Sequence, residues 1–214
     1  MGIDGSGKTT CAALLAKALK SKIKHKVRVI YAGNTGLRLG KRYSFYLSLP
    51  VDIIIHRILR RDHNYVYKNY PKLAKLETLL LTINYLLLIA LKVILYSKLY
   101  DVVIADRYVY DLIVSRIVVN AHIKLLTQLL YRVMPKPDLM ILLDVDEDMA
   151  YIRKHGEKNL HELKLLRKIY LHVTEKLNWK IINANKPLSF VFKDLWSEVS
   201  AVVPRDNSND RGQI

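Results

Sequence analysis

Residues 2–9 carry the pattern with the clearest chemical meaning, because they read GIDGSGKT and match G-x-x-x-x-G-K-[ST]. The glycines let the backbone curl so that its N–H groups point at phosphate oxygens, and a following helix adds the positive end of its dipole. Lys8 is expected to reach the β- and γ-phosphates of a nucleotide, and the Thr9 hydroxyl to bind Mg²⁺. The pattern therefore predicts a loop that binds ATP with Mg²⁺. The residues expected to hold the nucleotide here are Gly2, Ile3, Asp4, Gly5, Ser6, Gly7, Lys8, Thr9 and Thr10.

Asp106 is the second residue with a defined chemical use, because it follows the apolar run DVVIA at residues 101–105. A carboxylate at the end of a strand beside a phosphate loop can hold Mg²⁺ directly or through water. A helix N-cap or an ion pair with Arg107 would also explain it, but the phosphate loop favours the metal. Arg107 could bind an acceptor phosphate through two parallel hydrogen bonds.

Two further segments could complete such a site. Arg153, Lys154 and Lys158, with Arg167 further on, gather positive charge, and together they favour a mobile lid at about residues 151–168. For each of them alone, a solvated helix face is the better explanation. Arg153 is the best candidate among them to face the transferred phosphoryl group. The second segment follows a predicted strand, where side-chain amides could read the edge of a base or simply form a turn. Its residues are Asn183, Ala184 and Asn185.

The elements that must position these residues alternate between helices and short β-rich runs, which is typical of an α/β fold with a parallel sheet. We expect a three-layer α/β/α kinase domain over residues 1–203, with about five strands, and a disordered tail at residues 204–214. A loop at residues 33–40 should lead into basic helical segments up to Lys75. The expected strands are 27–32, 101–105, 139–143 and 179–182, and the expected helices are 8–22, 76–99, one from about 111, 147–154, 160–177 and 188–202.

One element of this fold is missing from the sequence. A phosphate loop normally follows the end of a buried strand, but only Met1 precedes Gly2. The sheet should therefore lack its first, central strand, leaving a slot lined by apolar side chains and unpaired backbone groups. We expect lowered stability in this chain and favour a truncated start as the explanation.

Composition limits the class of protein. Apolar residues make up 51% of the 214 residues, which is enough for a sizeable core. The net charge of +16 favours anionic partners, yet the sequence has no RNA-binding or zinc signature, so no nucleic acid is expected. Cys11 is the single cysteine, which excludes an internal disulfide and is typical of a buried residue in a reducing compartment. No secretory signal precedes the phosphate loop, and we expect a cytoplasmic protein.

Two patterns could be mistaken for membrane signals. Residues 1–6, MGIDGS, fit N-myristoylation, but the phosphate-loop match over the same residues is longer and more specific. Residues 79–96, LLLTINYLLLIALKVILY, are about long enough to cross a bilayer. Because this run contains Asn84 and Lys92 and leads directly into a required strand, a buried core helix is favoured and membrane association is not expected.

Together these motifs resemble the thymidylate kinase family of nucleoside monophosphate kinases. GIDGSGKTT at residues 2–10 is similar to that family's phosphate loop, and ADRY at 105–108 looks like its D-R-Y/H motif. Residues 137–154 resemble its fourth strand and the start of its lid, and INANKPL at 182–188 its adenine loop. The resemblance covers residues 2 to about 202. It implies ATP as donor, Mg²⁺ as cofactor and a nucleoside monophosphate as acceptor, by default dTMP.

The resemblance also implies roles for single residues and an assembly. Lys8, Arg107 and Arg153 would be catalytic, and Asp4 would be catalytic close to the acceptor's sugar and the transferring phosphate. Family members suggest a homodimer formed through packed helices, for which the long apolar helix would be a natural surface.

The departures from the family lie on the acceptor side. The family's R-E-P-G-G-T loop is replaced by AGNTGL at residues 32–37, and its serines and Tyr-Gln pair by VYDLIVSR at residues 109–116. Arg38, Lys41 or Arg42 could supply phosphate contacts instead. Two alternatives therefore stay open, namely a kinase-like enzyme with a non-nucleotide acceptor and a nucleotide-binding module without catalytic activity.

Overall fold

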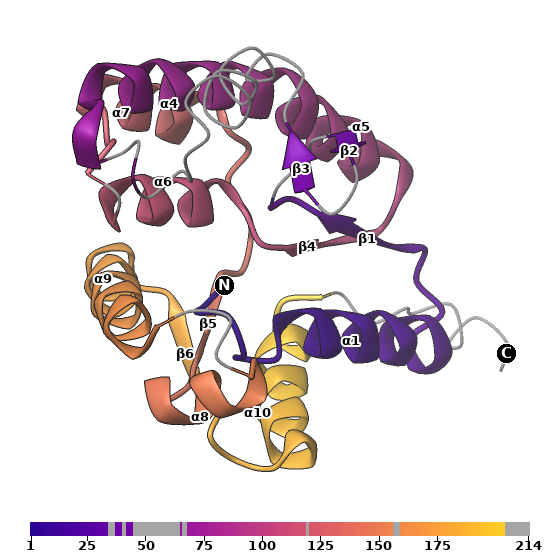
Figure 1. Ribbon diagram of the computed structural model, residues 1–214. Helices are drawn as coiled ribbons and strands as arrows, with labels where there is room; N and C mark the ends of the chain where they lie inside the picture. Colours follow the sequence, from indigo (N-terminus) through magenta and orange to yellow (C-terminus); the bar gives the residue numbers. More distant parts are fainter. Residues whose placement is uncertain are drawn as a thin grey trace, which may run out of the picture. The chain divides into compact units, whose positions relative to one another are not determined.

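The computed structural model describes residues 1–33, 37–39, 42–44, 65, 68–118, 120–155 and 159–203. The chain divides into two compact units, which are described separately and coloured along the sequence in Figure 1. Unit 1 consists of Met1–Ile30, Tyr96–Asp106 and Pro137–Ile214. Unit 2 consists of Tyr31–Leu95 and Arg107–Lys136.

Unit 1 is the α/β part of the chain and contains the phosphate loop. Its strands form two pairs, in which β1 (Val27–Tyr31) lies beside β4 (Val102–Asp106) and β5 (Ile141–Asp144) lies beside β6 (Lys180–Asn183). The strands β5 and β6 are parallel. The helices of this unit are α1 (Lys8–Lys22), α8 (Glu147–Arg153), α9 (Leu160–Leu177) and α10 (Leu188–Ser200).

The helices of unit 1 form where the sequence supplies caps and apolar faces. Helix α1 buries Cys11, Leu15 and Leu19, which recur every four residues along one face. Helix α9 begins after Asn159, whose side chain accepts a hydrogen bond of 2.7 Å from the backbone N–H of Glu162. In Figure 1, α9 lies on one side of the β5–β6 pair, and α1 and α10 lie on the other. Unit 1 therefore has the layered α/β arrangement expected from the sequence.

The strands of unit 1 form two separate pairs, and Met1 lies beside one of them. The Met1 amino group donates to the Ile141 carbonyl at 2.9 Å, and the Leu143 N–H donates to the Met1 carbonyl at 3.0 Å. These two bonds are the parallel-strand pattern opposite Leu142, so Met1 extends the β5–β6 pair by one residue. Among the described residues, β4 pairs only with β1. The two pairs thus remain separate sheets.

Unit 2 is mostly helical and differs from the sequence expectations in two places. Its helices include α4 (Pro71–Tyr85), which continues through a π-helical turn (Leu86–Ala90) into α5 (Leu91–Leu99), and then α6 (Val109–Val118) and α7 (Lys124–Val133). One helix was expected from about residue 111, and the structure has two in this region, α6 and α7. Asn120 adopts a left-handed φ of 52°, which ends α6 in the way that such residues commonly end helices.

The second difference follows β1, where a loop and basic helical segments were expected. Strand β2 (Leu37–Leu39) instead pairs with the antiparallel strand β3 (Arg42–Ser44), with Leu39 opposite Arg42. The expectations for residues 45–64 and for the tail at 204–214 lie outside the described residues.

The long apolar helix has one buried and one exposed face. It begins at Pro71, five residues before the expected start, because proline is favourable at the first helical position. The side chains of Tyr85 and Ile89 are buried, and the Tyr85 hydroxyl donates to the Ala32 carbonyl at 2.7 Å. By length and composition, the 29-residue helix from Pro71 to Leu99 could also cross a membrane, because an 18-residue window within it has a mean hydropathy of 2.2. The core helix of a soluble protein can have the same length and composition.

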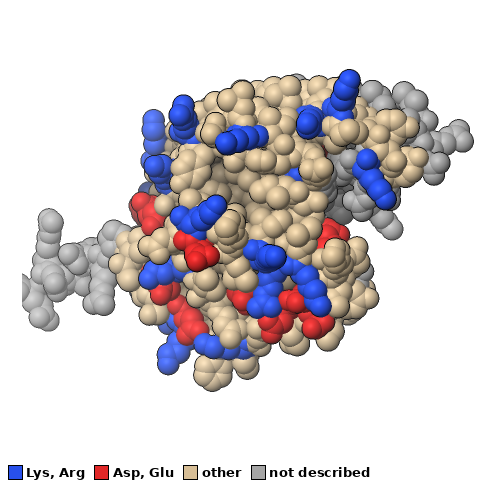
Figure 2. Space-filling model, turned by 90° about the vertical axis from the view of Figure 1, so that its left-hand side faces the viewer, with Lys and Arg blue, Asp and Glu red and all other residues tan. Residues whose placement is uncertain are grey.

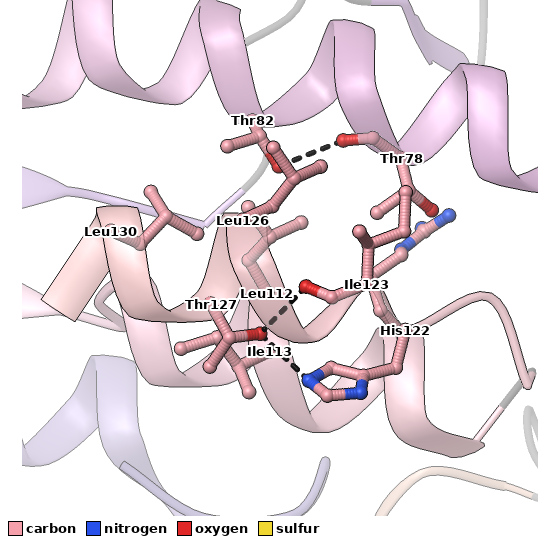
Figure 3. A pocket seen from close by; sticks show the side chains of 10 residues that line it. Thr78, Thr82, Leu112, Ile113, His122, Ile123, Leu126, Thr127 and Leu130 are labelled. Carbon is pink, nitrogen blue, oxygen red and sulfur yellow. Dashed lines mark hydrogen bonds between the residues drawn. The ribbon is translucent and has the colours of Figure 1, made fainter.

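A small pocket lies among α4, α6 and α7 of unit 2 (Figure 3). Its polar side chains bond to near neighbours, since the Thr82 hydroxyl donates to the Thr78 carbonyl at 2.8 Å and His122 Nε2 lies 2.7 Å from the Thr127 hydroxyl. Much of the remaining lining is aliphatic. Arg116 also lines the pocket, and its guanidinium lies 3.9 Å from the buried carboxylate of Glu77. The pocket is therefore a small gap between helices with one charged side chain at its wall. The aliphatic lining residues are Leu112, Ile113, Ile123, Leu126 and Leu130.

The divided sheet leads to a test of stability. We expect that a variant with about six valine- and isoleucine-rich residues added before Met1 will be more stable, because the addition continues the Met1–Leu142 pairing and buries apolar surface. A gain of about 2 kcal/mol corresponds to a rise in Tm of roughly 5 °C for a chain of this size. Scanning calorimetry measures the change.

The matched control carries proline two residues before Met1, where the backbone N–H should bond to β5. This control should lose most of the gain. Equal Tm values for the proline variant and the unmodified extension would show that no strand pairs there.

Candidate active site

The phosphate loop requires glycine at two positions because of both backbone angle and space. Gly2 has φ = 134°, and a Cβ atom there would lie 2.5 Å from the Leu143 carbonyl oxygen. Gly5 has φ = 89°, and a Cβ atom there would lie 2.7 Å from the Ala150 carbonyl oxygen. Any side chain would therefore push the loop away from β5 and α8. The glycines predicted from the motif hold the loop against the end of the sheet.

Lys8 lies across the loop at the first position of α1. Its ammonium group donates to the carbonyls of Gly2 at 2.8 Å and Ile3 at 2.6 Å, and it lies 4.0 Å from Asp4 Oδ1. Helix α1 receives no side-chain hydrogen bond from its N-cap residue, Gly7. Backbone N–H groups at the start of a helix and a lysine ammonium are the usual ligands of a phosphate group. The structure thus places the Lys8 ammonium group beside the Asp4 carboxylate.

Thr9 and Asp106 meet although they are 97 residues apart in the sequence. The Thr9 hydroxyl donates to Asp106 Oδ2 at 2.7 Å, and the Asp106 side chain is buried. Asp106 Oδ1 is buried as well and has no hydrogen-bond partner among the described residues. A buried carboxylate oxygen without a partner is costly unless a cation compensates it. A hydroxyl and a carboxylate are the hard oxygen ligands that Mg²⁺ prefers, so these two residues fit that ion.

No cluster of three acidic, histidine or cysteine side chains with metal-binding geometry exists in the part of the chain that the structure describes. Mg²⁺ does not require one, because it usually takes one or two protein ligands and completes its shell with phosphates and water.

Arg153 links the phosphate loop to the loop that follows β6. Its guanidinium donates to the Gly5 carbonyl at 3.3 Å and to the Ala184 carbonyl at 3.1 Å. The second loop is tightly held, because the Asn183 side chain accepts from the Asn185 N–H and the Asn185 side chain accepts from the Asp146 N–H, both at 2.9 Å. The side-chain oxygens of both asparagines thus stabilise their own loop. The structure brings this segment and Arg153 to the phosphate loop.

Arg167 does not belong with the lid cations, contrary to the grouping suggested by the sequence. Its guanidinium bonds to both carboxylate oxygens of Asp144, at 2.8 and 2.9 Å, and to Glu147 at 2.9 Å, and it lies 2.6 Å from Asp146 Oδ1. The hydrogen bond from Arg167 holds the pKa of the Glu147 carboxyl below its usual value. Arg167 therefore joins α9 to the end of β5 and the start of α8. The acidic run after β5, DVDED, was the signal in the sequence that could have identified this role.

On part of the surface, basic and acidic side chains lie close to one another (Figure 2). Figure 2 shows basic and acidic side chains interleaved on the face that carries α8 and α9.

Arg107 begins the second segment of unit 2 and has an unusual backbone conformation. Its φ of 70° is left-handed, which is uncommon for a residue with a side chain. Its guanidinium lies 3.8 Å from Asp111 Oδ1. The next residue, Tyr108, is buried and donates from its hydroxyl to the Pro135 carbonyl at 2.6 Å, and burial raises the pKa of this phenol. Residues with strained backbones concentrate at functional sites. The left-handed φ of Arg107 therefore makes it a candidate functional residue of this unit.

The remaining predicted residues fall into two groups. Ile3 and Ser6 are buried within the loop, and Thr10 is exposed on α1. Lys158, Lys41 and the side chains of Arg38 and Arg42 lie outside the described residues, as do the acceptor-side positions 34–36.

Comparisons with known proteins agree with this geometry. The model of the family described as thymidylate kinase matches residues 2–195. A probable thymidylate kinase from Archaeoglobus fulgidus is 27% identical over 215 residues, which is 97% of this chain and 97% of that protein. A probable thymidylate kinase from Methanothermobacter thermautotrophicus is 28% identical over 204 residues, which is 91% of this chain and 89% of that protein.

A solved structure supports the fold. Deoxyadenosine kinase from M. mycoides, described with the products dCMP and a flexible dCDP bound, matches with a TM-score of 0.59 and 15% identity. The match covers 94% of this chain and 97% of that one, and at this identity it concerns the fold alone. Because the family model spans nearly the whole chain and includes the phosphate loop, the Thr9–Asp106 pair and Arg153, this chain belongs to the thymidylate kinase family.

Proposed function

We propose that this protein transfers the γ-phosphate of ATP to a nucleoside monophosphate, and that the acceptor is dTMP, giving dTDP and ADP. The observation that carries this proposal is the Thr9–Asp106 hydrogen bond beside the phosphate loop, with a second buried oxygen on Asp106. Family membership supports the reaction type and the class of acceptor.

The donor half of the site is assigned to residues of unit 1. The loop N–H groups and the start of α1 would bind the phosphates of ATP, and Lys8 would reach its β- and γ-phosphates. The loop at residues 183–185 would lie against the adenine. Because the oxygens of Asn183 and Asn185 accept hydrogen bonds within their own loop, recognition there would use the remaining amide and backbone groups.

Thr9 and Asp106 would hold Mg²⁺, with Thr9 giving a hydroxyl oxygen and Asp106 a carboxylate oxygen. When bound, this ion neutralises charge on the β- and γ-phosphate oxygens. The buried Oδ1 of Asp106 supports this assignment, because the described residues leave it without a hydrogen bond.

The transfer step needs positioning and charge more than acid–base chemistry. A phosphate oxygen of the acceptor attacks the γ-phosphorus in line, and the bond to the β–γ bridging oxygen breaks as ADP leaves. Lys8 and Arg153 would neutralise the equatorial oxygens of the transferred group. Arg107 would bind the acceptor's phosphate, and Asp4 would lie near the acceptor's sugar. An acceptor monophosphate is already a dianion near neutral pH, so no general base is required.

Residues 109–116 depart from the family's serines and Tyr-Gln pair, which lie on the side of the acceptor's base. Within this segment, the guanidinium of Arg116 lies 3.9 Å from the buried carboxylate of Glu77. The comparisons favour a nucleotide acceptor over a non-nucleotide one. A soluble enzyme of nucleotide synthesis would act in the cytoplasm, without nucleic acid as a partner.

A coupled assay of ADP release tests the function with ATP, Mg²⁺ and dTMP, dUMP, dCMP or dAMP as acceptors. We expect transfer to dTMP, and a fall of at least about 1,000-fold in kcat/KM for Lys8→Ala, because the developing charge loses its nearest cation. Lys20→Ala on the last turn of α1 is the matched control and should retain full activity. Full activity in Lys8→Ala, or ATP binding without transfer to any acceptor, would contradict the proposal.

The metal assignment makes a separate prediction. Asp106→Asn keeps the shape and a hydrogen-bond acceptor for Thr9 but removes the charge. The Mg²⁺ concentration for half-maximal activity should therefore rise by about tenfold or more. Titrating MgCl₂ against initial rate measures this shift, and thermal unfolding without Mg²⁺ shows whether the variant folds. An unchanged Mg²⁺ requirement would exclude Asp106 as the metal-binding carboxylate.

We further propose that two copies of the chain pair through the exposed face of the long apolar helix. Leu87 and Leu91 are 54% and 64% exposed, and they lie within a stripe of apolar side chains spaced by three or four residues. Such a stripe is self-complementary when two antiparallel copies meet about a twofold axis. An exposed apolar patch of this length is typical of an interaction surface. The stripe consists of Leu76, Leu79, Ile83, Leu87, Leu91 and Ile94.

Light scattering coupled to gel filtration tests this pairing. The unmodified chain should have the mass of a dimer, and Leu87→Glu combined with Leu91→Glu should convert it to a monomer, because two charges would be buried in the interface. Leu125→Glu, at a 72% exposed apolar residue on α7, is the control and should remain dimeric. A monomeric unmodified chain would overturn the proposed pairing.

A further inference from the structure

We propose that Asp111 is a positioning residue that holds the guanidinium of Arg107 in the geometry that binds the acceptor's phosphate. This inference rests on the proposed function and deepens its acceptor side. The residues that carry it all lie in unit 2.

The backbone of Arg107 gives the first argument. A left-handed φ of 70° is unfavourable for a residue with a Cβ atom, because the Cβ atom crowds the following carbonyl oxygen. Such a conformation persists only where neighbouring contacts hold it. Because the side-chain direction follows from the backbone, whatever fixes this conformation also fixes where the guanidinium can reach.

Asp111 contacts both the backbone beside Arg107 and the Arg107 guanidinium, each through one of its two carboxylate oxygens. Helix α6 begins at Val109, so Tyr108 is its N-cap residue and Asp111 is its third helical residue. Oδ2 accepts a hydrogen bond of 2.9 Å from the Tyr108 N–H, which is the backward half of a capping box. Oδ1 lies 3.8 Å from Arg107 Nη1. One side chain therefore fixes the first turn of α6 and the guanidinium relative to each other.

Gly33 confines Arg107 from another direction. A Cβ atom at Gly33 would lie 2.5 Å from Arg107 Cδ and 2.7 Å from the Tyr31 ring. The aliphatic part of the arginine therefore passes directly over the Gly33 backbone. With Asp111 at its charged end and Gly33 along its stem, few orientations remain for this side chain.

Capping alone does not explain why the residue at position 111 is an aspartate. A neutral side chain can cap the helix without the cost of burying a charge, and the Asp111 side chain is only 7% exposed. The charge also acts on its surroundings, because burial first and then Asp111 raise the pKa of the Tyr85 phenol. Arg107 is a cation 3.8 Å from this buried carboxylate, and it helps to offset the charge.

Asp111→Asn separates the two roles of this residue. Asparagine can still accept the hydrogen bond from Tyr108, so the cap is kept, but it no longer attracts Arg107 by charge. We expect KM and Kd for dTMP to rise about tenfold, while KM for ATP stays unchanged and Tm stays within about 2 °C. Steady-state kinetics gives the two KM values, and titration calorimetry gives Kd for dTMP without depending on turnover.

A double-mutant cycle with Arg107→Ala distinguishes positioning from a general structural effect. If Asp111 acts through Arg107, then adding Asp111→Asn to Arg107→Ala should change Kd for dTMP by less than about twofold. Gly33→Ala should raise Kd for dTMP in the same way, because it displaces the arginine stem without changing any charge.

The failures of the two proposals can be told apart. Unchanged KM and Kd for dTMP in Asp111→Asn, with normal transfer by the unmodified chain, would overturn the inference and leave the proposed function in place. Weaker dTMP binding in Asp111→Asn, with no transfer by the unmodified chain, would overturn the proposed function and support the inference. Equal effects of Asp111→Asn with and without Arg107 would assign Asp111 a role that does not pass through the arginine.

Discussion

The hydrogen bond between Thr9 and Asp106 is the contact on which the site in unit 1 depends. It joins the second residue of α1 to the last residue of β4, and so it fixes the phosphate loop against a strand that lies far away in the sequence. Lys8 precedes Thr9 and is placed by the same contact. Burying the Asp106 carboxylate is unfavourable by itself, and the Thr9 hydroxyl satisfies only one of its oxygens. The second oxygen of Asp106 therefore stays buried without a hydrogen bond, which is unfavourable for folding, and a cation bound there would offset this cost.

The carboxylates of unit 1 fall into two groups, which differ in whether an arginine neutralises them. Asp144 and Glu147 are tied to Arg167 by several hydrogen bonds, and this arrangement holds α9 to the end of β5. The lowered pKa of Glu147 means that its contribution to stability is present above its usual pKa and is lost as the pH falls through the depressed value. Asp106 has no comparable cation among the described residues. The first group stabilises the unit, whereas Asp106 keeps an oxygen available.

The sequence predicted most elements that depend on local signals. The boundaries of α1 and α9 match because the glycine-rich loop, Asn159 and Asn178 mark their ends chemically. The end of α6 before Asn120 and the pairing of β2 with β3 were missed, because neither short segment carries a strong apolar period. Pairing of the acidic residues with Arg167 was missed for a different reason. It requires two helices and a strand to meet, and no spacing within one segment indicates this.

By itself, the sequence determined the chemistry of the loop, since the types and spacing of residues 2–9 leave few other uses for them. It also determined the α/β alternation, because helix and strand periods can be recognised within single segments. Tertiary structure decided which distant residues meet, namely Thr9 with Asp106 and Arg153 with the 183–185 loop. It also decided that the sheet is divided beside Met1 and that Asp111 faces Arg107. Contacts of this kind depend on how separate segments pack together, and that packing is a property of the whole chain.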